Sequence, residues 1–486
     1  MEKKWIELAP AEGILQSIGN PGTGVSGITF DSRMVVAGNI FVAQKGVHTD
    51  GHQFIQLAIE KGASVIVCEE LPMTLVENVL YIQVKDASET LGHLAAAWFD
   101  FPSEHLKVVG VTGTNGKTSI ATLSYHLFTI LGYKAGLIST ISTIVAGSME
   151  TATHTTPDAL KIQRLMAEMV EAGCEYCFME VSSHAVVQKR IAGIRFAGGI
   201  FTNLTHDHLD YHKTFPEYLA AKKAFFDGLS SDAFAITNID DKNGRIMTQN
   251  CRARIVTNST RTMADFRCKV MESHFDGMLL NLDGKEVWTR FVGKFNASNL
   301  LAVYSTAIML GQKMEEILPV ISQLTPVAGR FDSIRSTDGK MAIVDYAHTP
   351  DALKNVLMAI SEIRSGNEKV ITVVGAGGDR DKTKRPEMAR EALQGSDIVI
   401  LTSDNPRTED PEAIIKDMEA GIDKSSANKV LSITNRKEAI RTALNLAQTG
   451  DIILVAGKGH ENYQEINGIK HHFDDKEIIT EFFGLA

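Results

Sequence analysis

The stretch Val111-Thr112-Gly113-Thr114-Asn115-Gly116-Lys117-Thr118 decides how the rest of this chain is interpreted. It follows a short apolar segment, 106–111, and precedes a segment from Ser119 onward whose apolar residues recur at helical spacing. A glycine-rich turn between strand and helix that ends in Gly-Lys-Thr is typical of a phosphate-binding loop. The usual pattern has glycine at position 111, which is Val here, with Gly110 and Gly113 on either side.

This loop predicts that the chain binds ATP or GTP together with magnesium. Backbone N–H groups of the turn and of the following helix N-terminus would point at the phosphates. The Lys117 ammonium would pair with β and γ oxygens, and the Thr118 hydroxyl would coordinate Mg²⁺. A nucleotide site is therefore the first functional hypothesis.

Length and composition are those of an ordinary globular protein. The 486 residues exceed what one core accommodates and predict roughly three domains of about 100–200 residues. Hydrophobic residues make up 44%, charged residues 22%, and the net charge of −10 argues against nucleic acid as a main partner. The sequence has no apolar run that would cross a bilayer and no charged-then-apolar leader. We therefore expect a cytoplasmic protein that binds neither nucleic acid nor membranes, and we take a monomer as its expected state.

The predicted strands divide the chain into three α/β units, 1–103, 104–331 and 332–486. The clearest predicted strands are 38–43, 63–68, 79–84, 106–111, 176–181, 198–203, 341–345, 370–375, 398–402 and 451–456. Alternation of strands with helical stretches predicts a central, doubly wound, mostly parallel sheet that carries the phosphate loop. A smaller N-terminal α/β domain and a C-terminal Rossmann-like α/β domain would flank it.

Polar side chains follow two predicted strands of the central unit, where an open α/β sheet binds its ligands. Glu180 ends one strand and could complete the Mg²⁺ shell begun by Thr118, because magnesium prefers hard oxygen ligands. The segment His206-Asp-His-Leu-Asp-Tyr-His212 follows the other strand. Those histidines and aspartates also fit a zinc or di-iron site, which stays open as an alternative.

Three loops of the C-terminal unit each follow a predicted strand. They are 377–382, 404–407 and 457–461, and together they carry arginine and acidic side chains. Such a combination favours a small ligand with both carboxylate and ammonium groups, and an amino acid is the natural candidate. The pair Lys222-Lys223 lies in a predicted helix over 218–226, where a solvated helix face is the simplest interpretation.

These motifs in this order resemble the Mur ligases of peptidoglycan synthesis, and the resemblance covers nearly the whole chain. The displaced glycine of the phosphate loop is also a feature of that family. The matching segments are Asp31-Ser32-Arg33, 112–118, 180–184, 203–211, 295–299, Gly329-Arg330, 345–350 and the three C-terminal loops.

The resemblance implies an ATP site and a catalytic centre with two Mg²⁺ ions. The residues implied to bind ATP are Gly113, Thr114, Asn115, Gly116, Lys117, Thr118, Ser119, Asn296, Asn299, Arg330 and Asp345. The implied catalytic residues are Lys117, Glu180, His208 and Lys222. The implied metal ligands are Thr118, Glu180, His208 and Lys222. In the family, the lysine that matches Lys222 is carbamylated, which turns a cation into a carboxylate ligand.

The resemblance also implies two further binding sites. Those expected to hold UDP-N-acetylmuramoyl-L-Ala-D-Glu are Ser32, His48, Thr49, Thr155, Thr156, Ser182, Gln188 and Arg190. Those expected to hold meso-diaminopimelate are Arg380, Asp404, Asn405, Arg407, Gly457 and Glu461. The arginine in Asp404-Asn-Pro-Arg407 favours diaminopimelate over L-Lys, because it can pair with a distal carboxylate that lysine lacks.

The implied activity is amide ligation through an acyl phosphate on the D-Glu carboxylate. The alternatives are the same ligation with L-Lys, a ligase that resembles folate polyglutamating enzymes, and a non-enzymatic protein switched by nucleotide binding.

Overall fold

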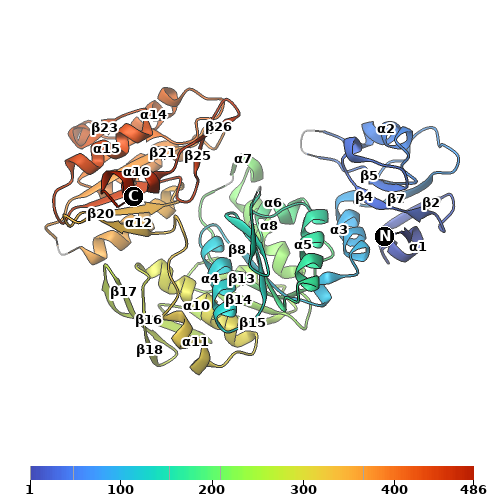
Figure 1. Ribbon diagram of the computed structural model, residues 1–486, viewed down its shortest axis with the longest axis horizontal. Coiled ribbons are helices and arrows are strands. Elements are labelled where there is room, and N and C mark those ends of the chain that lie inside the picture. The colour runs from blue at the N-terminus through green and yellow to red at the C-terminus, as the bar shows by residue number, and fades with distance from the viewer. Residues whose placement is uncertain (1, 47–48, 153, 208, 365, 486) are drawn as a thin grey trace.

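The computed structural model of the chain describes residues 2–46, 49–152, 154–207, 209–364 and 366–485. Figure 1 shows three lobes that follow one another along the chain, with the first and last on opposite sides of the middle one. Each lobe is built on a sheet of its own. The predicted class, a three-part α/β protein, is therefore confirmed.

The middle lobe has one sheet of eleven strands in the order β11-β10-β9-β12-β8-β13-β14-β15-β16-β17-β18. The strands from β9 to β16 pair in parallel, and antiparallel strands extend the sheet at both ends. Their bounds are β8 Lys107–Thr112, β9 Ala135–Ile138, β10 Ser142–Val145, β11 Ser148–Thr151, β12 Tyr176–Glu180, β13 Phe196–Phe201, β14 Phe234–Asn238, β15 Arg254–Ser259, β16 Phe266–His274, β17 Gly277–Leu282 and β18 Lys285–Thr289. Because β8 lies between β12 and β13, the residues that follow these three strands meet at one edge.

The helices of the middle lobe begin where the sequence offers caps. Thr214 accepts from the backbone N–H of Glu217 at the start of α8, and Asp158 accepts from that of Lys161 at the start of α5. The bounds are α4 Lys117–Ile130, α5 Ala159–Glu171, α6 Ser183–Val187, α7 Leu209–His212, α8 Phe215–Asp227, α9 Gly244–Met247, α10 Lys294–Met309 and α11 Met314–Ile321.

The N-terminal lobe has a five-stranded sheet in the order β2-β7-β6-β5-β4, in which only the pairing of β2 is antiparallel. Its elements are β1 Lys3–Lys4, α1 Trp5–Leu8, β2 Ile14–Ile18, β3 Gly24–Val25, β4 Gly27–Thr29, β5 Asn39–Val42, α2 Ile55–Glu60, β6 Val65–Cys68, β7 Leu80–Val84 and α3 Ala87–Trp98. Helix α3 lies against α5 of the middle lobe. A Cβ atom on Gly92 of α3 would lie 2.5 Å from the Ala192 carbonyl oxygen, so only glycine permits this approach.

The C-terminal lobe has a six-stranded sheet in the order β19-β20-β24-β21-β22-β23, with only β19 antiparallel, and a separate hairpin of β25 and β26. Its strands are β19 Asp332–Arg335, β20 Met341–Asp345, β21 Val370–Ala376, β22 Ile398–Ser403, β23 Val430–Ser432, β24 Ile452–Ala456, β25 Tyr463–Ile466 and β26 Ile469–His472. Its helices are α12 Pro350–Ile363, α13 Lys384–Gly395, α14 Pro411–Glu419, α15 Arg436–Leu446 and α16 Asp475–Phe482.

The predicted strands agree with the observed ones to within about three residues at each end. The predicted strand 106–111 is β8, Lys107–Thr112, and the predicted strand 341–345 is β20, with the same bounds. The helix predicted from Ser119 begins earlier, at Lys117. Gly116 takes the left-handed conformation with φ of +89°, which turns the chain directly into α4 without a separate capping side chain.

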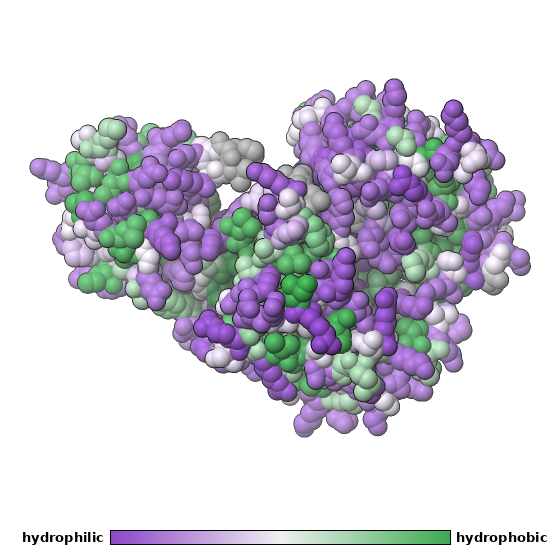
Figure 2. All heavy atoms as spheres, turned by 180° about the vertical axis from the view of Figure 1, so that it is seen from behind, coloured by the Kyte–Doolittle hydropathy of each residue, from purple (hydrophilic) through white to green (hydrophobic). Residues whose placement is uncertain are grey.

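The surface of the molecule mixes polar and apolar residues. In the view from behind, a notch separates the N-terminal lobe from the rest, and hydrophobic residues are scattered among hydrophilic ones (Figure 2). Within the described ranges, no helix combines the length and the apolar character needed to cross a membrane.

A buried ion pair ties α15 to α16 in the C-terminal lobe. The Arg436 guanidinium donates to both Asp475 carboxylate oxygens, at 2.8 and 2.7 Å, and both side chains are 0% exposed. The same guanidinium donates to the Ala456 carbonyl oxygen at 3.0 Å, at the end of β24. This pair therefore supports the strand end from which one of the three predicted ligand loops departs.

We expect Asp475→Ala to lower the free energy of unfolding of this lobe by about 3–5 kcal/mol, because it leaves the Arg436 charge buried without its partner. Glu481→Ala is the matched control, since Lys437 and Glu481 form an exposed pair between the same two helices. That change should cost under about 1 kcal/mol. Urea denaturation of both variants measures the difference, and equal losses would contradict the role given to the buried pair.

Candidate active site

The phosphate loop connects β8 to α4 at the centre of the middle sheet. Gly113 has φ of +146°, and a Cβ atom there would overlap the Thr202 hydroxyl. Thr114 donates its backbone N–H to the Asn203 carbonyl oxygen at 2.8 Å, and the Thr202 hydroxyl donates to the Asn115 carbonyl oxygen at 2.6 Å. The residues after β13 thus fix the shape of the loop.

Asn115 connects the loop to the C-terminal lobe as well. Its backbone N–H donates to the Asn203 side-chain oxygen at 2.9 Å. Its side-chain amide donates to Asp351, in the first turn of α12, at 3.1 Å. The phosphate loop is therefore held by hydrogen bonds from the middle lobe and from the C-terminal lobe.

Two lysine amines meet at one carbonyl oxygen of the loop. Lys117 donates to the Gly113 carbonyl at 3.0 Å and to the Thr114 carbonyl at 2.8 Å, while Lys222 donates to the Gly113 carbonyl at 2.8 Å. Lys222 is 1% exposed and its amine lies 4.7 Å from the centre of the Tyr218 ring. Burial, and then the charge of Lys117, hold the pKa of Lys222 well below its usual range.

Burial also lowers the pKa of Lys117, and the nearby Glu180 carboxylate acts in the opposite direction. The solvated helix face considered for Lys222 is wrong, because α8 turns this side chain into the molecule beside the loop. The same helix presents Lys223 differently, in a pair with Asp227 at 2.6 Å.

Glu180 has the character of a magnesium ligand. It is 0% exposed at the end of β12, and its Oε1 accepts from the Thr140 backbone N–H at 2.7 Å. Its Oε2 is buried and has no hydrogen-bond partner among the described residues. A buried carboxylate oxygen near the Lys117 amine and the start of α4 fits a hard divalent cation. The described part of the chain contains no cluster of three or more His, Cys, Asp and Glu side chains that could hold a metal, and His208 lies outside the described residues.

The two described histidines of the segment after β13, His206 and His212, do not gather around one point. The His206 ring nitrogen lies 3.3 Å from Asp381 of the C-terminal lobe, whereas that of His212 is buried 2.8 Å from the Ser183 hydroxyl. These two members of the segment thus face different partners, which disfavours a zinc or di-iron site built from them.

Four residues predicted to bind ATP lie where the middle and C-terminal lobes join. Arg330 donates to the Thr118 hydroxyl at 3.2 Å and stacks on Tyr346, with its guanidinium carbon 4.3 Å from the ring centre. Asp345 accepts from the backbone N–H of Phe331 at 2.6 Å, and burial raises its pKa. At the start of α10, Asn299 donates to the Asn296 side-chain oxygen at 3.2 Å. The oxygen of Asn299 would lie 2.7 Å from a Cβ on Gly116, so this pair reaches the loop.

Five residues predicted to hold the muramoyl dipeptide form one network beside Glu180. Thr156 donates to the Glu180 carbonyl at 2.8 Å and lies 3.3 Å from the Ser182 hydroxyl. Arg190 donates to the Thr156 carbonyl at 2.7 Å and to the Gln188 side chain at 2.6 Å. The fifth residue, Thr155, accepts from the Thr140 hydroxyl at 3.1 Å.

The predicted uridine-side residues belong to the N-terminal lobe. Ser32 is buried in the short 3-10 helix Ser32–Met34, which the Asp31 side chain caps. Thr49 is exposed, and its carbonyl accepts from the Gly46 backbone N–H at 2.9 Å. His48 lies outside the described residues. No contact joins Ser32 or Thr49 to the loop network among the interactions of the described chain.

Most of the predicted amino-acid pocket assembles around Glu461. Asn405 donates to Glu461 Oε2 at 2.8 Å, and a Cβ atom on Gly457 would lie 2.6 Å from Asp404 Oδ2. Arg407 donates to the Gly378 carbonyl at 2.6 Å, from the neighbouring loop. Arg380 is exposed and donates to the Asp379 carbonyl at 3.3 Å, which leaves it at the rim.

Two residues that the sequence analysis left without a role connect these sites. Tyr346 stacks under Arg330, and its hydroxyl lies 3.4 Å from Glu461 Oε1. Lys458 is 0% exposed and donates to Glu461 Oε2 at 3.0 Å. Both lie inside motifs that the sequence analysis had singled out, so a buried position within such a motif was the available signal.

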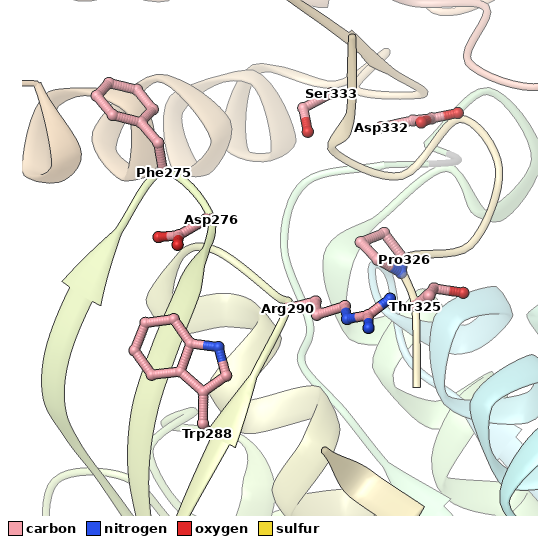
Figure 3. A pocket seen from close by; sticks show the side chains of 8 residues that line it. All are labelled: Phe275, Asp276, Trp288, Arg290, Thr325, Pro326, Asp332 and Ser333. Carbon is pink, nitrogen blue, oxygen red and sulfur yellow. The ribbon is translucent and has the colours of Figure 1, made fainter. Parts of the chain in front are cut away.

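A separate hollow of about 490 Å³ lies where the middle and C-terminal lobes join. Figure 3 shows Trp288 and Arg290 on the β17–β18 side, with Asp332 and Ser333 on the other. None of its lining residues belongs to the predicted sites. The chain crosses between the lobes beside this hollow, through Gly329 and Phe331, whose φ angles of +67° and +52° are both left-handed.

Three family models match consecutive parts of the chain. They are the Mur ligase family catalytic domain over residues 24–99, the Mur ligase middle domain over 111–307, and the Mur ligase glutamate ligase domain over 329–459. The matches follow the order of the three lobes.

Curated relatives align over nearly the full length. A protein of Phocaeicola vulgatus is 60% identical over 96% of both chains, and one of Bacteroides fragilis is 58% identical over the same shares. Both are named UDP-N-acetylmuramoyl-L-alanyl-D-glutamate--2,6-diaminopimelate ligase. A solved structure of a ligase with this name is 32% identical, covers 100% of this chain and 99% of its own, and has a TM-score of 0.70.

The chain matches three consecutive models of one family, and it is 60% and 58% identical to two ligases over nearly its full length. It therefore belongs to the Mur ligase family.

Proposed function

We propose that the chain is an ATP-dependent ligase that joins meso-diaminopimelate to the D-Glu carboxylate of UDP-N-acetylmuramoyl-L-Ala-D-Glu. The observation that carries the proposal is one chain of contacts from Thr118 through Arg330 and Tyr346 to Glu461. It joins a phosphate loop to a pocket of opposite charges, as the activation and acceptor halves of a ligase require. The names of the relatives supply the two substrates.

Each lobe would bind one of the three substrates. The proposed domains are 1–103 for the uridine nucleotide, 104–331 for ATP and 332–486 for the amino acid. Thr155, Thr156, Ser182, Gln188 and Arg190 would hold the dipeptide beside Glu180, and Ser32, Thr49 and His48 would face the nucleotide. We also propose a cytoplasmic monomer, because the incoming substrates are water-soluble and all three lobes belong to one chain.

The first step would transfer the γ-phosphoryl group of ATP. A D-Glu carboxylate oxygen attacks the γ phosphorus, the bond to the ADP oxygen breaks, and an acyl phosphate forms. Lys117 and the loop N–H groups would offset the negative charge that collects on the transferring group. Two Mg²⁺ ions, held by Thr118, Glu180, His208 and a carbamylated Lys222, would supply further charge compensation.

The second step would form the amide bond. The amine of diaminopimelate attacks the acyl carbon, and the bond to the phosphate oxygen breaks with loss of a proton from nitrogen. Asn405, Asp404, Arg407, Gly457 and Glu461 would hold the far end of the amino acid, with Arg380 at the rim. Two charged groups on that end match a pocket that offers both carboxylates and arginine.

The lowered pKa of Lys222 is compatible with carbamylation. A neutral amine attacks CO₂ to give a carbamate and a proton, whereas an ammonium group has no lone pair to attack with. The carbamate on Lys222 carries a negative charge beside the Lys117 ammonium. The repulsion between two lysine ammonium groups is thereby replaced by an attraction between opposite charges. This supports assigning the modified lysine as a ligand that would help to hold the second magnesium ion.

The central test is an assay of the full chain with ATP, Mg²⁺, UDP-N-acetylmuramoyl-L-Ala-D-Glu and meso-diaminopimelate. We expect ADP release to need both other substrates and to stop with EDTA. Replacing diaminopimelate by L-Lys should lower kcat/KM at least about tenfold, since the pairing of Arg407 with a distal carboxylate is lost. ADP release without the acceptors would favour a nucleotide switch, and a preference for L-Lys or a folate substrate would overturn the assignment.

Lys222→Ala should lower kcat about a hundredfold or more, because it removes a metal ligand. Formate or acetate should restore part of the activity by replacing the missing carboxylate, and the intact wild-type mass should include one added CO₂. Lys223→Ala is the matched control on the same helix, and it should stay within about twofold of wild type because Lys223 pairs with Asp227, one turn along α8, rather than with the phosphate loop. If formate and acetate restore no activity and the wild-type mass lacks the added CO₂, the modification is refuted.

A further inference from the structure

Lys458 is a fully buried lysine inside the loop that follows β24. Its side chain is 0% exposed, and its amine donates to Asn405 Oδ1 at 3.2 Å and Glu461 Oε2 at 3.0 Å. It also lies 5.4 Å from the centre of the Tyr463 ring. Burying an ammonium group is costly unless its partners compensate, so this charge has a defined place in the pocket.

The contacts of Lys458 fix which oxygen of Glu461 faces the pocket. Oε2 accepts from both Lys458 and the Asn405 amide, at 3.0 and 2.8 Å. Among the described residues, the partner of Oε1 is the Tyr346 hydroxyl at 3.4 Å, which is long for a hydrogen bond between oxygens. Oε1 is therefore the Glu461 oxygen with capacity left for a further donor.

Lys458 also orients Asn405. The Asn405 side-chain oxygen accepts from Lys458 and from the Glu465 backbone N–H at 2.9 Å, so its amide must turn toward Glu461. The Lys458 amine thereby contacts both neighbours at once, and it orients Asn405 together with the Glu465 backbone N–H.

The same amine balances the charge of the pocket. The pocket carries three carboxylates, on Asp404, Glu461 and Glu465, and three cations, on Lys458, Arg407 and Arg380. The Arg407 Nε lies 3.6 Å from Glu465 Oε2. One oxygen of Asp404, Oδ2, is buried without a hydrogen-bond partner in the part of the chain that is described. A balanced pocket suits an end group that carries an ammonium and a carboxylate together. A lone ammonium would need an excess of negative charge that Lys458 removes.

We propose that Lys458 is a positioning residue that orients Glu461 and Asn405 and, by its charge, favours a zwitterionic amino-acid end over a lone ammonium. The proposal rests on the proposed function, whose acceptor site it deepens. Lys458 would act through Glu461 and Asn405 rather than by touching the substrate.

The test compares Lys458→Met with Lys470→Met in the full-length enzyme. Lys470 is the matched control, since its amine lies 4.1 Å from the centre of the same Tyr463 ring but its side chain is exposed. Kinetic constants are measured for meso-diaminopimelate, L-Lys and ATP. Binding of ADP by calorimetry and thermal unfolding report on the fold.

We expect Lys458→Met to lower kcat/KM for diaminopimelate at least about tenfold, mainly through KM, with KM for ATP within about twofold of wild type. The rate with L-Lys should fall less, so that the ratio between the two amino acids narrows. Lys458→Gln, which keeps an amide donor without charge, should recover part of the KM for diaminopimelate but not the ratio. Lys470→Met should match wild type.

An equal loss with diaminopimelate and L-Lys, or a parallel rise in KM for ATP, would reduce Lys458 to a structural residue and overturn the proposal. Unchanged kinetics in Lys458→Met would overturn it as well. If Lys458→Met fails to bind ADP, the Lys458→Gln variant is used for the test instead. If the ratio of rates with diaminopimelate and L-Lys in Lys458→Gln equals that of wild type, the charge argument is refuted. Wild-type enzyme that makes no diaminopimelate product would instead refute the proposed function.

Discussion

Two buried amines share the Gly113 carbonyl oxygen, and much of the active site depends on that arrangement. Lys117 comes from the helix that the loop begins, and Lys222 comes from α8, far along the chain. Two cations in this position repel each other, so the site is stable with one amine neutral or with anions close by. The glycine is required because Thr202 occupies the space of a side chain. The proposed phosphate and metal sites therefore share one backbone group.

The three lobes meet the loop in different ways. The middle lobe shapes it through the residues after β13, and the C-terminal lobe reaches it through Asp351 and Arg330. The N-terminal lobe contacts the middle lobe through α3, at a distance from the loop. The proposed activation and acceptor sites are thus joined by direct contacts, whereas the nucleotide part of the larger substrate would span the distance to the N-terminal lobe.

The sequence predicted the strands and the gathering of most site residues, because buried strands have strong apolar patterns and ligands collect at strand ends. Thr156 precedes Ser182 and Arg190 by 26 and 34 residues but lies in one network with them, and the resemblance implied that the three bind the same substrate. The burial of Lys222 came only from the resemblance, since a helix of mixed composition does not reveal which face packs inward. Lys458 and Tyr346 stayed without roles because their functions depend on contacts between loops. The observed start of α4 lies two residues before the predicted start, because a left-handed glycine takes the place of a capping side chain.

A substitution in the connection between the last two lobes would affect two sites at once. Gly329 belongs to the segment that precedes the ATP-side arginine, yet a Cβ atom there would collide with the backbone of Gly459 and His460. Any missense change at this codon would therefore displace the loop that carries Glu461. A genetic screen would record such an allele as a defect in amino-acid use, although the altered residue lies next to the nucleotide site.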